Sequence, residues 1–172
     1  MSRTRNIVLT GFMGTGKTAI GKALADRLER PFIDMDEEIV NRAGKPIPRI
    51  FAEDGEPFFR ELERQVVIDL SAEPGQVIAA GGGVVINPAN IADFSATGLV
   101  VCLTATPETI LERVKDDTNR PLLDVPDKLA RIRELLEVRR AYYDAIPVQI
   151  PTDNRLVDAI VDAILARYNA GD

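Results

Sequence analysis

The stretch that decides the fold is Asn6-Ile-Val-Leu-Thr-Gly-Phe-Met-Gly-Thr-Gly-Lys-Thr18. It begins with a short apolar run, which is typical of a buried strand, and it ends in G-x-x-x-x-G-K-[ST], the pattern of a phosphate-binding loop. An amphipathic helical pattern follows at once, with Ile20, Leu24 and Leu28 on one face. The motif requires this order of strand, loop and helix, so the stretch predicts a nucleotide-binding domain of the α/β class.

Each part of the loop has a chemical purpose. Its glycines let backbone N–H groups surround anionic oxygens, and the dipole of the following helix adds positive potential. Lys17 can reach the β- and γ-phosphates of a nucleotide, and the Thr18 hydroxyl can ligate Mg²⁺. The alternative is a glycine-rich turn with an ordinary surface lysine.

Composition narrows the chemistry further. The chain has 172 residues, of which 45% are hydrophobic and 28% are charged, and this length and apolar content predict one globular domain. It has no histidine, which excludes a Ser-His-Asp triad and a histidine zinc site, so proton transfer falls to carboxylates, lysines or tyrosines. The single cysteine, Cys102, lies in an apolar run, which predicts a buried thiol in a reducing compartment.

Charge and hydropathy limit the partners. The net charge of −6 argues against nucleic acid as the main partner, because binding phosphate backbones requires clustered excess Lys and Arg. No apolar stretch approaches the roughly 20 residues that span a bilayer, and the run Ile7–Leu9 is too short for a signal peptide. We therefore expect a cytoplasmic protein without a membrane partner.

Strand and helix patterns alternate along the chain, which indicates a parallel sheet with helices on both faces. The five predicted strands are Asn6–Thr10, Pro31–Met35, Gln76–Ala80, Leu99–Leu103 and Ile146–Ile150. Two segments break the alternation. The stretch from about Asp36 to Glu56 predicts an inserted helical subdomain, and the polar segment 115–121 is either a solvated connection or a lid.

Two acids stand at the carboxyl end of a predicted strand, where α/β sheets place their ligands. They are Asp34 and Asp36, and the strand ends near Ala80 and Leu103 offer no carboxylate. Spaced by two residues, their side chains point to the same side if the chain is still extended there. One acid can then support the metal and the other the acceptor hydroxyl. Alternatively, both acids only stabilise the N-terminus of the next helix.

Several arginines occupy unusual positions. Arg139 and Arg140 continue an apolar helical stripe, and Arg60 lies one turn into a predicted helix. Residue type alone favours salt bridges for them, but Gly81-Gly82-Gly83 indicates a backbone that another group approaches closely. Arg120, in the polar segment, can neutralise charge on a transferring phosphoryl group. Together these features predict phosphoryl transfer to an acidic, hydroxylated small molecule.

The sequence resembles the shikimate kinases across nearly the whole chain, from Arg5 to about Arg167. The motifs that carry the resemblance are Gly11–Thr18, Asp34-Met-Asp36, Ile50-Phe51 with Gly55-Glu56-x-x-Phe59-Arg60, Gly81-Gly-Gly83, Arg120-Pro-Leu-Leu123 and Arg139-x-x-x-Tyr143. One departure is Ala141, where the family usually has proline.

The resemblance implies transfer of the ATP γ-phosphate to the 3-hydroxyl of shikimate, a step in chorismate and aromatic amino acid synthesis. It implies a nucleoside-monophosphate-kinase-like fold, with helices around a five-stranded parallel sheet in the order 2-3-1-4-5. We accordingly expect a single domain over 1–172 that acts as a monomer, with a substrate-binding insertion at about 35–64 and a lid at about 114–126.

The resemblance also implies residue roles. Asp36 binds the acceptor hydroxyl and acts as its base, Asp34 supports Mg²⁺ through water, and Lys17 and Arg120 assist the transfer. Shikimate is held by Arg60 and Arg139 at its carboxylate and by Gly82 and Gly83, although the neighbouring Arg140 leaves the choice of Arg139 open. The residues expected to bind ATP are Gly11, Met13, Gly14, Thr15, Gly16, Lys17, Thr18, Arg113, Arg120, Asn154 and Arg155.

Two other readings stay open. The chain can be another small P-loop kinase, acting on gluconate, adenylyl sulfate or a nucleotide, although its 5% aromatic content gives little support to a pocket for a base. It can also be a nucleotide-binding switch without an acceptor, which leaves Asp36, Arg60 and the three glycines without a shared purpose.

Overall fold

The structure is a computed structural model that describes residues 4–118 and 120–172. Its centre is a five-stranded parallel sheet in the order β2-β3-β1-β4-β5. The strands are β1 (Asn6–Thr10), β2 (Phe32–Asp34), β3 (Val77–Ala79), β4 (Gly98–Thr104) and β5 (Val148–Pro151). The α/β class and the predicted strand order are therefore confirmed; β1 has the predicted bounds, and the ends of the other four strands differ by one or two residues.

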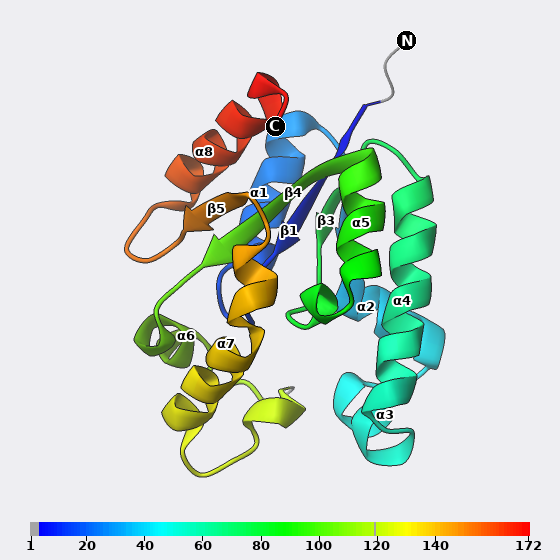
Figure 1. Cartoon of the computed structure of the whole chain (residues 1–172), viewed down its shortest axis with the longest axis vertical. Helices are drawn as coiled ribbons and strands as arrows, with labels where there is room; N and C mark the ends of the chain where they lie inside the picture. The colour runs from blue at the N-terminus through cyan, green and yellow to red at the C-terminus, as the bar shows by residue number, and fades with distance from the viewer. Residues whose placement is uncertain (1–3, 119) are drawn as a thin grey trace.

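Successive side chains of the central strand β1 point to opposite faces of the sheet, and each face is covered by a layer of helices (Figure 1). Ile7 and Leu9 of β1 pack in a cluster with α1 and α8, whereas Val8 packs in the cluster on the opposite face, which includes residues of α4, α5 and α7. In the register of the sheet, Val8 lies between Ile78 of β3 and Val100 of β4. Such a strand, buried on both faces, reads as a continuous apolar run.

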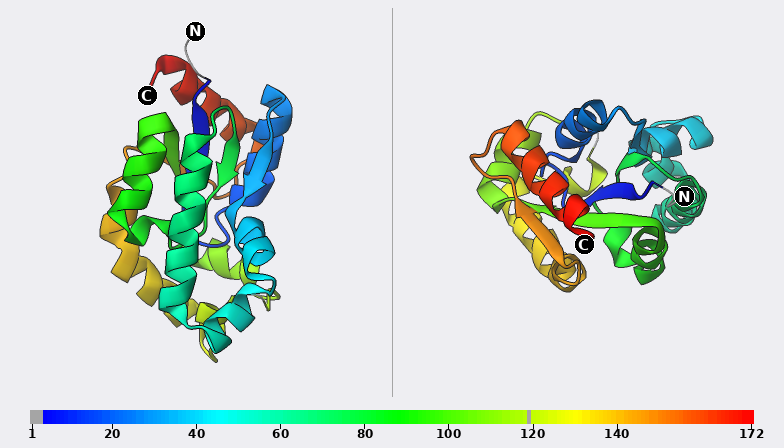
Figure 2. Two further views of the ribbon diagram at one scale, coloured as in Figure 1. Left: turned by 90° about the vertical axis from the view of Figure 1, so that its right-hand side faces the viewer. Right: turned by 90° about the horizontal axis from the view of Figure 1, so that it is seen from above.

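Helices cover both faces of the sheet, as the end-on view in Figure 2 shows. They are α1 (Lys17–Leu28), α2 (Met35–Ala43), α3 (Ile47–Glu53), α4 (Glu56–Ala72), α5 (Pro88–Thr97), α6 (Pro107–Val114), α7 (Lys128–Asp144) and α8 (Val157–Ala170), with the 3₁₀ turns η1 (Val84–Ile86) and η2 (Pro121–Leu123). Among the described residues, no helix is both long enough and apolar enough to cross a membrane.

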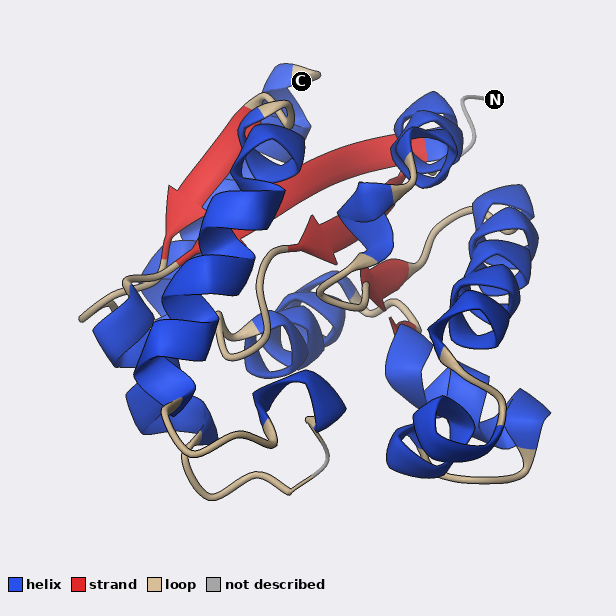
Figure 3. Cartoon of the chain, turned by 60° about the horizontal axis from the view of Figure 1, so that its bottom comes forward, coloured by secondary structure: helices blue, strands red, loops and turns tan. Residues whose placement is uncertain are grey.

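The two irregular segments lie at the carboxyl edge of the sheet (Figure 3). The expected helical insertion contains α2 and α3, which pack on each other and on α4. The other segment joins α6 to α7 and carries η2, which packs between α3 and α7. Residue 119, within the range expected for a lid, lies outside the described residues.

Candidate active site

The phosphate-binding loop joins β1 to α1 and has a backbone that requires glycine. Gly11 has a φ of 136°, and a Cβ at this position would overlap the carbonyl oxygen of Leu103 in β4. The loop is therefore pressed against the neighbouring strand. The loop follows the carboxyl end of β1, and α1 begins there at Lys17, so an anion at this edge of the sheet gains from the helix dipole.

Lys17 folds back over this loop. Its Nζ donates to the carbonyl oxygens of Gly11 at 2.7 Å and of Phe12 at 2.9 Å. Burial of the ammonium lowers the pKa of Lys17 to about 8, although the carboxylate of Asp36 opposes this shift. The ammonium is thus poorly solvated and gains strongly from phosphate oxygens.

A cavity of about 300 Å³ opens above the loop, and we call it the phosphate cavity. It brings together residues from the P-loop, the predicted acid pair and two arginines. Its lining residues are Gly14, Gly16, Lys17, Thr18, Ala19, Asp34, Asp36, Ala79, Ala80, Gly82, Arg113 and Arg120.

Asp34 and Asp36 both line the phosphate cavity, but their backbone differs from the extended chain considered above. The strand ends at Asp34, whose carboxylate caps α2 by accepting from the backbone N–H of Asp36 at 2.9 Å. Asp36 therefore lies in the first turn of α2, so the chain is not extended there and the condition for a shared side is not met, although both acids line the phosphate cavity. Asp34 therefore caps a helix, as the alternative interpretation expects, and its Oδ2 also accepts from the Thr18 hydroxyl at 3.3 Å.

Asp36 lies where two cavities meet, since it lines both the phosphate cavity and a second, smaller one. Burial and the neighbouring charge of Asp34 raise the pKa of its carboxyl, while Arg120 and Lys17 oppose the shift. The nearest guanidinium nitrogen of Arg120 is 3.9 Å from its Oδ2. A carboxylate with a raised pKa is a stronger proton acceptor than an exposed one.

The second cavity, which we call the acceptor cavity, has a volume of about 70 Å³. It unites the two predicted arginines with the three glycines and with residues of the η2 segment. It is lined by Met13, Asp36, Ile47, Phe51, Phe59, Arg60, Glu63, Gly81, Gly82, Gly83, Arg120, Pro121, Leu122 and Arg139.

Arg60 reaches this cavity from α4 because Gly83 leaves room for it. A Cβ at Gly83 would overlap the guanidinium, which explains the close approach that the glycine run predicts. Arg60 also pairs with Glu63 at 3.0 Å and Glu56 at 3.3 Å. Glu63, only 2% exposed, lines the cavity and was missed by the sequence reasoning, although its position three residues after Arg60 on one helix face was a usable signal.

Arg139 reaches the same cavity from α7. It is 4% exposed, and its guanidinium lies 5.8 Å from the centre of the Phe12 ring. None of the ion pairs found within the described chain involves Arg139, whereas Arg140 points outward and pairs with Glu137 at 2.8 Å. A buried guanidinium without a carboxylate partner is a strong site for an anion. The geometry thus favours Arg139 over Arg140.

The residues expected around the nucleotide divide into two groups. Arg113 donates to the carbonyl oxygens of Gly14 and Thr152, at 3.0 and 3.1 Å, so it joins the P-loop to the loop after β5. In contrast, Asn154 and Arg155 are exposed and do not line the phosphate cavity.

Two P-loop side chains also face away from the phosphate cavity. The Thr15 hydroxyl donates to the Phe12 carbonyl oxygen at 2.8 Å, and the side chain is 1% exposed. Met13 lines the acceptor cavity instead. Any contact of these two residues with a nucleotide is therefore expected to come from the backbone.

The fold and the two joined cavities define a P-loop kinase for a small, anionic acceptor. The shikimate kinase family model matches residues 13–169. A shikimate kinase of Dechloromonas aromatica is 48% identical over 96% of this chain and 91% of its own length. The chain belongs to the shikimate kinase family, and it is a phosphotransferase that uses ATP as co-substrate.

Solved structures agree with this assignment. The shikimate kinase of Acinetobacter baumannii, solved in complex with shikimate, has a TM-score of 0.93 and 35% identity over 98% of this chain and 95% of its own. A gluconokinase of Sinorhizobium meliloti has a TM-score of 0.59 at 18% identity, covering 99% and 94%, and so shares the fold alone. The family predicted from the motifs is confirmed, and the gluconate alternative is not favoured.

Proposed function

We propose that the chain transfers the γ-phosphate of ATP to the 3-hydroxyl of shikimate, with the triphosphate in the phosphate cavity and shikimate in the acceptor cavity. The observation that carries this proposal is the position of Asp36, which lines both cavities. A group placed there meets the acceptor hydroxyl on one side and the transferred phosphate on the other.

Asp36 orients the hydroxyl and takes its proton as the new P–O bond forms. The raised pKa of its carboxyl suits this task. Phosphoryl transfer passes through a loose transition state, so most of the catalysis comes from positioning and from charge stabilisation. Lys17 and Arg120, which line the phosphate cavity with Asp36, supply positive charge to the oxygens in transfer.

Arg60 and Arg139 hold the shikimate carboxylate. They enter the acceptor cavity from α4 and α7, and planar guanidinium groups match the two oxygens of a carboxylate. Arg139 forms none of the ion pairs among the described residues and only a longer-range attraction with Glu63, so it gains most from the anion. Gly82 and Gly83 let the ring of shikimate approach the backbone.

The residues near Thr18 suit Mg²⁺. The Thr18 hydroxyl and the Asp34 carboxylate are hard oxygen donors that already touch each other. The described residues contain no cluster of three or more acidic, histidine or cysteine side chains that could hold a metal alone, which fits an ion shared with nucleotide oxygens and water. Thr18 would hold the ion through its hydroxyl and Asp34 would support it through water, and the ion would supply positive charge to the phosphates.

The segments around the acceptor cavity act as an insertion and a lid within a single domain over residues 1–172. The insertion covers about 35–64 and the lid about 114–126. At about 70 Å³, the acceptor cavity is smaller than the roughly 300 Å³ of ordinary ligand pockets. Shikimate therefore enters when η2 moves away from α3, and the return of η2 carries Arg120 to the phosphate.

The adenine of ATP lies beside Arg113 and the loop after β5. The contacts of Arg113 with Gly14 and Thr152 support this placement, because they join that loop to the P-loop. Asn154 and Arg155 follow on the same loop and are exposed, so they contact the adenine only if this loop closes over it.

The direct test is ADP release in a coupled assay with shikimate, with gluconate and with no acceptor. We expect ADP only in the presence of shikimate, together with one equivalent of a phosphorylated product. ADP that forms at the same rate without an acceptor would instead indicate a nucleotide-hydrolysing switch. ADP that forms with gluconate alone would assign a different kinase activity.

A further inference from the structure

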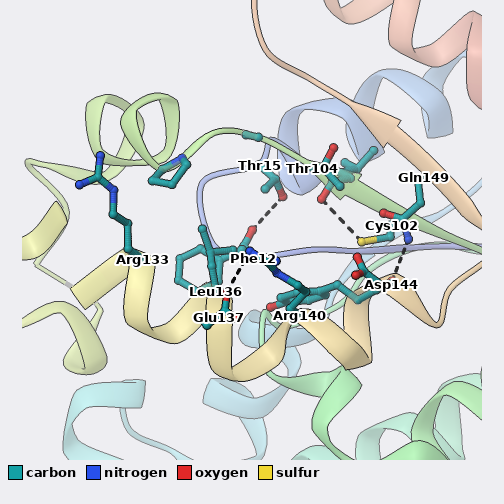
Figure 4. A pocket seen from close by; sticks show the side chains of 14 residues that line it. Phe12, Thr15, Cys102, Thr104, Arg133, Leu136, Glu137, Arg140, Asp144 and Gln149 are labelled. Atoms are coloured by element: carbon teal, nitrogen blue, oxygen red, sulfur yellow. Dashed lines mark hydrogen bonds and ion pairs between the residues drawn. The ribbon is translucent and has the colours of Figure 1, made fainter. Parts of the chain in front are cut away.

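A third cavity, of about 490 Å³, lies behind the P-loop between α6, α7 and the ends of β4 and β5 (Figure 4). It shares no lining residue with the phosphate cavity or the acceptor cavity, so the proposed reaction does not use it. We call it the rear cavity. Its volume falls within the range of small-molecule sites.

The interior of the rear cavity is apolar. Phe12 and Cys102 line it from the P-loop and β4, and Leu136 and Tyr143 line it from α7. Cys102 is 1% exposed, and burial raises the pKa of its thiol to about 11, so the sulfur is a neutral, weakly polar surface rather than a nucleophile. A cavity lined by aromatic and aliphatic side chains suits a flat apolar group.

At the mouth of the rear cavity, each arginine has an acidic partner and one carboxylate, that of Asp144, is left over. Arg133 pairs with Glu108 at 2.6 Å, and Arg140 pairs with Glu137 at 2.8 Å. The side-chain carboxylate of Asp144, which lines the same cavity from α7, takes part in no hydrogen bond or ion pair with the rest of the described chain. Figure 4 shows its side chain beside Cys102 and Gln149 at the edge of the apolar interior.

We propose that the rear cavity binds a small molecule in which a flat apolar group is joined to one protonated amine. The apolar group fills the space between Phe12, Leu136 and Tyr143, and the ammonium pairs with Asp144. A carboxylate in place of the amine would meet Asp144 unfavourably, because both arginines at the mouth already have acidic partners.

An occupant of the rear cavity would touch residues whose other ends reach the active site. The Tyr143 hydroxyl donates to the carbonyl oxygen of Gly82 at 2.5 Å, and Phe12 accepts from Lys17. The proposed ligand therefore packs against the back of both substrate cavities without entering either. A ligand that binds there has a physical route to alter the kinase.

The test uses 2-phenylethylamine as the probe, with 2-phenylethanol and 3-phenylpropanoate as neutral and anionic analogues. Binding is measured by titration calorimetry on the full chain, with ADP and shikimate at saturation so that the other two cavities are filled. We expect the amine to bind at least fivefold more tightly than the alcohol, as a partly exposed ion pair of about 1 kcal/mol predicts. The anion should bind more weakly than either.

Two variants locate the binding. Asp144→Asn should reduce the affinity for the amine about fivefold, to that of the alcohol. Asp26→Asn, which removes another exposed charge without an ion pair, on α1 far from the rear cavity, should leave the affinity unchanged. Leu136→Trp fills the cavity from a half-buried position and should abolish binding of both the amine and the alcohol.

The proposal is overturned if the alcohol binds as tightly as the amine, if Asp144→Asn and Asp26→Asn behave alike, or if no probe binds. An apparent Kd for the amine that keeps rising in proportion to the concentration of shikimate or ADP, without reaching a plateau, would place the amine in a substrate cavity and would equally overturn the proposal.

Discussion

At the scale of single residues, burial acts in opposite directions on the two groups that meet the transferred phosphate. It raises the pKa of Asp36 and lowers that of Lys17, because in each case the charged form loses hydration. Each buried charge is therefore stabilised when a partner of opposite charge binds to it. For Asp36 this partner is a proton, and for Lys17 it is phosphate.

The role of Asp36 is tested by Asp36→Asn. The amide keeps the size of the side chain but cannot accept the proton, so kcat should fall roughly 10²- to 10⁴-fold while the Kd for ATP stays within about twofold. Steady-state kinetics and calorimetric ATP binding measure the two quantities. Loss of ATP binding in this variant would place Asp36 in the nucleotide site instead.

Lys17 gives a pH dependence with a definite sign. With a pKa of about 8 in the free enzyme, Lys17 loses its proton as the pH rises through that value. Bound phosphates favour the ammonium and raise its pKa, so ATP binding takes up a proton. The Kd for ATP should therefore increase above pH 8, by up to about tenfold per pH unit.

The proton uptake is measurable by calorimetry at pH 8 in buffers that differ in ionisation enthalpy. We expect an uptake of about half a proton at the pKa of the free group. Lys17→Met should remove the uptake together with most of the affinity. An identical uptake in Lys17→Met would assign the proton to another group.

The carboxylate site is tested by substituting Arg139, with the exposed neighbour Arg140 as the matched control. Arg139→Lys removes the planar donor pair from a buried position, so the KM for shikimate should rise roughly 10- to 100-fold, with a smaller effect on the KM for ATP. Arg140→Lys changes an exposed side chain and should leave both values unaltered. Equal effects of the two substitutions would contradict the assignment.

At the scale of elements, the predicted pattern and the structure agree on what local sequence controls. Continuous apolar runs mark strands such as β1 because both of its faces are buried, and helical spacing marks α1 and α4. The difference at Asp36 arises from capping. The Asp34 side chain accepts from the first backbone N–H groups of α2, so the strand ends one residue earlier than the pattern indicates and Asp36 is helical.

The contacts that the sequence did not reveal join distant segments. The Tyr143 hydroxyl meets Gly82 across 61 positions, and Thr152 donates to the Thr15 carbonyl oxygen across 137. Such pairs depend on how helices and loops pack, which no local period encodes. The rear cavity is likewise a product of packing, since α6, α7 and two strands each contribute only part of its wall.

Tyr143 is the point where α7 holds the glycine loop. Tyr143 lies one turn after Arg139 on α7, and its hydroxyl donates to the Gly82 carbonyl oxygen. Tyr143→Phe removes this buried hydrogen bond, so the KM for shikimate should rise about three- to tenfold. The KM for ATP should not change, which a general loss of stability would not explain. Tyr142→Phe, at an exposed neighbouring position, serves as the control.

At the scale of the whole molecule, an acidic chain surrounds a cationic site. The net charge is −6, yet Lys17, Arg60, Arg120 and Arg139 converge on two joined cavities. They come from α1, α4, the η2 segment and α7, so the site exists only when both sides of the sheet's carboxyl edge are in place. Two anionic substrates can therefore bind side by side in a molecule that repels anions elsewhere.

Closure of the η2 segment gives the last prediction. In the structure η2 already lies on α3 and α7, and the amides of Leu123 and Val125 are hydrogen-bonded within the segment at 2.9 Å. If shikimate binds only while this segment is closed, shikimate at about 100 times its Kd should slow hydrogen exchange of these two amides by about a hundredfold relative to the complex with ADP alone. Amides of α8, remote from both cavities, are the internal reference. Unchanged exchange at Leu123 and Val125, with both ligands shown to be bound, would mean that shikimate enters by another route and that the segment is not a lid.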